Sequence, residues 1–155
     1  MDFDRERARY RFTAQYRFTP RFQAGFEYNA AAHELAPIAN WVLTPESEKI
    51  PMISANVSSD RLGTPKGPMS YGVTFAKGFQ NPKIAPYFSV RYSEYEHGLN
   101  FPFGVNIQLN NEWSLMPMND GRKSHVLLTY TKPDFSVSLM LIWLKHPGIS
   151  ISWGF

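Results

Sequence analysis

The chain has 155 residues, enough for one domain, and combines 15% aromatic residues with a net charge of only +3. It contains no cysteine, which excludes a disulfide framework and a cysteine-based metal site. The longest apolar run, residues 139–144, is far shorter than the roughly 18 residues of a membrane-spanning helix. We therefore expect a single domain, residues 1–155, that is not a helical membrane protein.

Apolar and polar residues alternate with a period of two along most of the chain, which predicts short β-strands. In the first strand, residues 9–18, Phe12 and Tyr16 alternate with Arg11 and Arg17. The same alternation predicts strands at residues 22–29, 53–58, 69–76, 88–93, 101–109, 124–131, 135–143 and 149–155. Weaker patterns at residues 35–43, which include Pro37, and at residues 113–118 bring the count to eleven.

Segments rich in Pro, Gly, Asn and Asp separate these strands and predict turns. They lie at residues 19–21, 63–67, 80–82, 110–111, 119–121, 132–134 and 146–148. Short connections between successive strands are typical of an all-β, antiparallel up-and-down barrel. Because single-chain membrane barrels have an even number of strands, we expect 10 to 12: ten without residues 35–43, or twelve with one more strand.

The character of the two strand faces favours a transmembrane β-barrel over a soluble one. One face carries Phe, Tyr, Trp, Leu, Ile or Val at nearly every position, and a small barrel interior cannot hold so many large side chains. The opposite face is small or hydrogen-bonding, which suits the polar interior of a membrane barrel. Several aromatic residues near strand ends are also typical of interfacial girdles.

On this interpretation, polar and charged residues of both signs line the lumen and pair across it. The predicted lumen-lining residues are Arg9, Arg11, Gln15, Arg17, Glu27, Arg91, Asn106 and Gln108. The N-terminal arginines fall on alternate residues, so they form one face of a strand rather than a nucleic-acid-binding patch. No nucleic-acid partner is expected.

The last strand shows the clearest alternation. Ile149, Ile151, Trp153 and Phe155 share one face and are separated by small residues. This ending resembles the C-terminal signature of bacterial outer-membrane β-barrel proteins, in which the last strand ends in Phe and serves as an assembly signal. The resemblance implies location in the outer membrane of a Gram-negative bacterium, with outer-membrane lipids, the barrel assembly machinery and other envelope proteins as partners. Because charged residues follow Met1, such a chain would lack an upstream leader or strand.

No nucleotide-binding loop, metal-ligand spacing or nucleophile elbow is present, so no cofactor or metal is expected. The favoured function is non-enzymatic: a narrow passive, porin-like pore or a structural and docking component of the cell envelope. One alternative is a lipid-modifying or proteolytic enzyme at the rim of the barrel. Its candidate residues are Ser93, His97, Asp120, Ser124 and His125. The other alternative is a soluble β-barrel that binds an apolar ligand.

Overall fold

The computed structural model describes residues 11–80 and 83–154, which form β-strands and turns without an α-helix. The strands belong to one 13-stranded sheet in the order β1-β2-β3-β4-β5-β7-β9-β10-β11-β12-β13, and two short strands, β6 and β8, pair with β7. Neighbouring strands are antiparallel. This confirms the all-β, antiparallel part of the expected fold.

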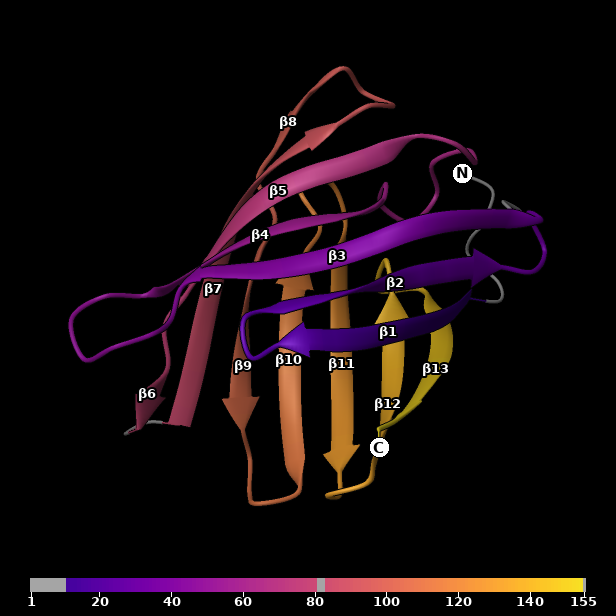
Figure 1. Ribbon diagram of the computed structural model, residues 1–155. Helices are drawn as coiled ribbons and strands as arrows, with labels where there is room; N and C mark the ends of the chain where they lie inside the picture. The colour runs from indigo at the N-terminus through magenta and orange to yellow at the C-terminus, as the bar shows by residue number, and fades with distance from the viewer. Residues whose placement is uncertain (1–10, 81–82, 155) are drawn as a thin grey trace. The chain divides into compact units, whose positions relative to one another are not determined.

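The described chain falls into two compact units, and the first takes its residues from Met1–Phe75 and Ser89–Asn100. It contains β1 (Arg11–Thr19), β2 (Phe22–Asn29), β3 (Glu34–Thr44), β4 (Met52–Ser59), most of β5 (Met69–Ala76), the end of β7 (Lys83–Ser93) and β8 (Gly98–Asn100). In Figure 1, β1, β2 and β3 lie side by side, joined by short turns.

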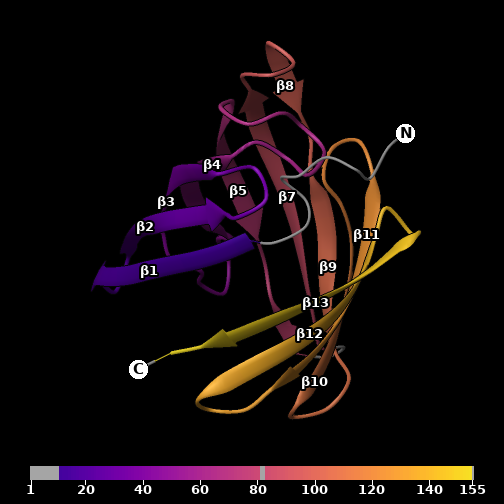
Figure 2. The same ribbon diagram turned by 90° about the vertical axis from the view of Figure 1, so that its right-hand side faces the viewer.

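The second unit takes its residues from Ala76–Phe88 and Phe101–Phe155. Besides the start of β7 it contains β6 (Phe79–Gln80), β9 (Phe103–Gln108), β10 (Trp113–Asn119), β11 (Ser124–Thr131), β12 (Phe135–Ile142) and β13 (His146–Trp153). Strands β9 to β13 follow one another across this part of the sheet (Figures 1 and 2).

Both weakly patterned segments are strands. Residues 35–43 belong to β3, and residues 113–118 belong to β10, although each strand contains a proline. Pro37 lies outside the part of β3 that pairs with β4, which covers Ala39–Thr44. Proline is tolerated where its missing N–H has no ladder partner.

Two predicted boundaries were wrong. The turn expected at residues 146–148 lies earlier, at Trp143–Leu144, and β13 begins at His146. Both turn residues have positive φ, 54° and 55°, a conformation usually supplied by Asn or Gly. The strand expected at residues 101–109 begins only at Phe103, because Phe101 and Pro102 separate it from β8.

Closure of the sheet was also expected. In the strand order, β1 and β13 are the two ends, and within the described residues they are not paired with each other. Within the described residues the sheet has 13 strands, β6 and β8 included, which is more than the expected 10 to 12, and it is not closed into a barrel.

Candidate functional site: the polar face of the sheet

On most strands the two faces differ in an unusual way, because large apolar side chains are exposed and polar side chains are buried, whereas β1 is exposed on both faces. In the first unit, the side chain of Trp41 is 55% exposed, whereas Glu27 is 6% and Ser54 is 3% exposed. In the second unit, Ile149 is 67% exposed and His125 only 6%. This polarity is the reverse of that in a water-soluble domain, where apolar side chains occupy the interior.

Few apolar side chains are buried among the described residues. They are Ala32, Ala36 and Ile142. The buried polar and charged residues are more numerous: Glu27, Asn29, Ser54, Ser59, Asp60, Thr64, Ser70, Ser89, Ser93, Asn100 and His125. Since buried polar groups are costly unless they are hydrogen-bonded, the contacts of this polar face are the centre of the site.

An acidic side chain on β2 joins three strands. Glu27 forms an ion pair with Arg11 of β1, with 2.7 Å between the guanidinium nitrogen and the carboxylate oxygen. Its other carboxylate oxygen accepts a hydrogen bond from the hydroxyl of Ser59 on β4. Two residues from the predicted lumen set are therefore brought together, and the buried carboxylate is compensated by charge and by a hydrogen bond.

A row of polar residues crosses the first unit. The register aligns Arg17 with Gln23, Gln23 with Asn40, and Asn40 with Asn56. The row then continues through side-chain hydrogen bonds. Asn56 Nδ2 donates to Thr74 Oγ1 at 3.1 Å, and Thr74 Oγ1 lies 2.8 Å from Ser89 Oγ.

Arg91 of β7 reaches along this polar face. Its guanidinium donates a hydrogen bond to Ser58 Oγ at 3.0 Å. Gly72 makes room for it, because a Cβ at Gly72 would lie 2.7 Å from Arg91 Cγ and 3.0 Å from Asn56 Oδ1. The glycine thus has a packing reason rather than a conformational one.

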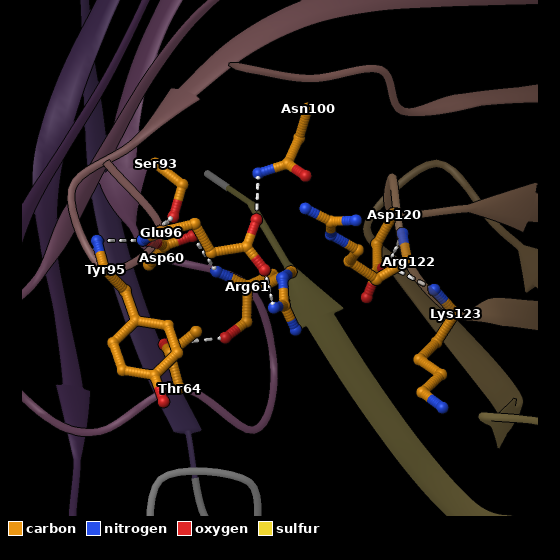
Figure 3. A network of polar contacts seen from close by, with 10 residues as sticks. All are labelled: Asp60, Arg61, Thr64, Ser93, Tyr95, Glu96, Asn100, Asp120, Arg122 and Lys123. Carbon is orange, nitrogen blue, oxygen red and sulfur yellow. Dashed lines mark hydrogen bonds and ion pairs between the residues drawn. The ribbon is translucent and has the colours of Figure 1, made fainter. Parts of the chain in front are cut away.

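At the end of β4, a denser network connects two loops of the first unit (Figure 3). Ser93 Oγ donates to Asp60 Oδ2 at 2.5 Å and accepts from the backbone N–H of Glu96 at 3.1 Å. The Glu96 carboxylate is paired with the Arg61 guanidinium and accepts from Asn100 Nδ2 at 2.8 Å. Sequence reasoning missed Asp60, Arg61 and Glu96, since they lie in turns where charged residues are common.

In the second unit, Asp120 and His125 flank the turn between β10 and β11. Asp120 Oδ2 lies 3.0 Å from His125 Nε2, and Asp120 Oδ1 accepts from the backbone N–H groups of Arg122 and Lys123 at 2.9 and 2.7 Å. Burial raises the pKa of Asp120, but the hydrogen bond with His125 and the two backbone hydrogen bonds outweigh burial and lower this pKa below its usual value. Figure 3 shows Asp120 with Arg122 and Lys123.

The rim residues do not form a catalytic triad among the described residues. His125 Nδ1 accepts from the backbone N–H of Trp143 at 3.5 Å, so both ring nitrogens are engaged. The hydroxyl of Ser124 accepts from Asn119 Nδ2 at 3.2 Å, and Ser93 is bonded to Asp60. His97 lies in the turn between β7 and β8 with φ of 51°. A serine activated by histidine, which such an enzyme needs, is absent from this arrangement.

The remaining predicted lumen residues have varied surroundings. Gln15 lies on β1 with Arg11 and Arg17 on the same face. Asn106 is half-buried on β9, whereas Gln108 is exposed and its amide donates to the backbone oxygen of Asn110 in the following turn. Arg9 lies outside the described residues.

The C-terminal strand presents its apolar residues on one face. Ile149, Ile151 and Trp153 are all exposed, and they pair with Leu139, Val137 and Phe135 of β12. Phe155, the last residue of the expected assembly signal, lies outside the described residues.

The described residues hold no cluster of three or more His, Cys, Asp or Glu side chains suited to a metal ion. Within the same residues, no helix is long and apolar enough to cross a membrane. Comparison of the chain with protein-family models, curated proteins and solved structures gave no match. The functional argument therefore depends on the residues themselves.

Proposed function

We propose that this chain is a transmembrane β-barrel protein of the bacterial outer membrane with a non-enzymatic role in the cell envelope. The observation that carries the proposal is the reversed polarity of the strands. Lipid acyl chains would cover the exposed rings, and the polar face would line the barrel interior. Exposed side chains such as Phe26, Trp41 and Ile151 would then lie in an apolar environment rather than in water.

A soluble barrel with an apolar ligand is less well supported. Such a protein would pack its rings around a central ligand and expose its serines. The exposed positions are instead occupied by large rings and aliphatic side chains on both units. Burial of Ala32, Ala36 and Ile142 removes little apolar surface from water, and a water-soluble domain of this length depends on removing much more.

A membrane location places one further demand on the sheet. Backbone N–H and C=O groups within lipid must be hydrogen-bonded, so spanning sheets have no open edges. The proposal therefore requires the outer edges of β1 and β13 to be paired when the protein is in the membrane.

The polar face favours a structural or docking role over a wide channel. Its side chains largely bond to one another, as in the Arg11–Glu27–Ser59 and Asn56–Thr74–Ser89 contacts. A narrow passive pore is the second candidate. Because arginines outnumber carboxylates on β1 and β2, a water path along this face would favour anions.

Depth-dependent fluorescence quenching tests the membrane assignment. Single-tryptophan variants that keep only Trp41 or only Trp143 are reconstituted in vesicles of phospholipid with brominated acyl chains. We expect strong quenching of Trp41, which is exposed on the apolar face of β3, and weaker quenching of Trp143, which lies in a turn. Equal quenching at the level of an aqueous control, with the wild-type chain recovered in the aqueous fraction without detergent, would overturn the proposal.

Planar-bilayer recordings separate the two candidate roles. The structural role predicts no conductance, and the narrow pore predicts small, slightly anion-selective steps. A large cation-selective conductance would contradict the polar lining described above.

A further inference from the structure

A small pocket lies at the end of the first hairpin. Its volume is about 250 Å³, and it is lined by Arg17, Thr19, Pro20, Arg21, Phe22, Gln23, Asn40 and Val42. We refer to it as the arginine pocket. Because a water molecule accounts for about 30 Å³ of liquid volume, the pocket has room for a small oxyanion together with part of its hydration shell.

The fold brings these side chains together from three strands. The register places Arg17 of β1, Gln23 of β2 and Asn40 of β3 next to one another. A register shift after Arg17 adjusts the end of β1, where the polar row meets the turn. The pocket is thus one end of the polar row that crosses the first unit.

The turn that carries the second arginine is held firmly. Thr19 Oγ1 accepts hydrogen bonds from the backbone N–H groups of Arg21 and Phe22, at 3.2 and 3.0 Å. The carbonyl oxygen of Arg21 accepts from the backbone N–H of Val42 on β3 at 2.7 Å. These bonds hold the backbone of Arg21 in place beside the pocket.

The charge of the lining is one-sided. Two arginines and two amide residues belong to the lining, and none of the described residues that line the pocket is acidic. Glu46 and Glu48 of the loop between β3 and β4 are not among the lining residues. Arginine presents a planar fork of N–H donors that matches the oxygens of phosphate, and amide groups add further donors.

We propose that the arginine pocket binds a phosphate-type oxyanion, with Arg17 and Arg21 as charge-assisted donors and Gln23 and Asn40 as amide donors. The anion is either free inorganic phosphate or the phosphate of a lipid headgroup, which share this chemistry. The site goes beyond the envelope role proposed above, because it gives the first unit a specific anionic ligand at one end of its polar row.

Titration of the full chain in neutral detergent micelles tests the site. Inorganic phosphate and a short-chain phosphatidic acid are added separately, and binding is followed by phosphorus NMR line broadening. Arg17→Gln and Arg21→Gln should each weaken binding about tenfold, because each loses a charge-assisted donor. Lys145→Gln, which removes an equal charge from an exposed turn of the second unit, should bind as the wild type does.

Tighter binding of inorganic phosphate identifies a free-anion site, and tighter binding of phosphatidic acid identifies a headgroup site. The proposal is overturned if neither probe binds, or if all three variants lose affinity equally. Since both arginines are exposed, their replacement should preserve the far-ultraviolet circular dichroism spectrum, which is recorded for every variant. The titration needs no bilayer, so its failure leaves the quenching test of the membrane assignment unaffected.

Discussion

A single charge placed on the apolar face measures what surrounds that face. Leu139 lies within β12, where it pairs with Leu128 on one side and Ile149 on the other. Its side chain is 54% exposed, and that of Leu144, in the turn between β12 and β13, is 53% exposed. The two leucines are therefore matched in exposure, but Leu139 lies within a strand and Leu144 lies in a turn.

In water, Leu139→Arg and Leu144→Arg would be nearly equivalent, because exposed substitutions usually change the free energy of unfolding by less than about 0.5 kcal/mol. In a bilayer, an arginine at the midplane of a β-barrel costs about 2–4 kcal/mol, and one near the interface about 0–1 kcal/mol. We expect Leu139→Arg to fall in the first range and Leu144→Arg in the second. The loss of about 2–4 kcal/mol in Leu139→Arg corresponds to a folding equilibrium constant lower by roughly 30- to 700-fold.

Urea-induced unfolding in phospholipid vesicles, followed by tryptophan fluorescence, gives both free energies in one system. The same titration in neutral detergent micelles serves as the reference for folding without a bilayer. If the two arginine variants lose stability equally in vesicles, the apolar face of β12 does not contact lipid and the membrane assignment fails.

Three further predictions concern polar contacts and strain. Glu27→Ala should lower the free energy of unfolding by about 1–3 kcal/mol, because the buried Ser59 hydroxyl loses its acceptor and the exposed Arg11 loses its ion-pair partner; a urea titration showing no loss would mean that water fully replaces these contacts. The lowered pKa of Asp120 stabilises the fold above the unfolded-state pKa of about 3.9, and this contribution is lost as the pH falls through the lower folded-state value. Asp120→Asn, which weakens the contact with His125, should therefore cost about 1 kcal/mol at pH 7 and progressively less as the pH falls below about 3.9, and a cost that does not change with pH would refute the linkage. Leu144→Gly should raise stability by about 1 kcal/mol, since glycine adopts positive φ without strain, whereas a lower midpoint of thermal unfolding would show that Leu144 is not strained.

The positions of most strands were predictable from the sequence because one face is consistently apolar. Alternation is a local property, and it identified β2, β4 and β5 without knowledge of their neighbours. It also indicated which side of β12 and β13 would carry exposed rings. Both strands with weaker patterns, β3 and β10, are stabilised by neighbours on the two sides of the sheet, which no local pattern reveals.

The site was predictable only in part. Arg11, Glu27 and Arg91 were identified by the face on which they lie, but their partners were not. Asp60 and Ser93 are 33 residues apart, so their contact depends on the strand order rather than on any motif. The turn at residues 143–144 was misplaced because Trp and Leu are poor residues for positive φ, whereas the nearby Pro and Gly carry the usual turn signal.

The row from Arg17 to Ser89 has a consequence for evolution. Asn56, Thr74 and Ser89 sit on three different strands, and each can change its size or its donor only if its neighbour changes too. Substitutions at these positions should therefore be inherited together, as compensating pairs, while the exposed rings drift among apolar residues independently of one another. Correlated substitutions should therefore be found among the polar residues of this chain rather than among its exposed apolar residues.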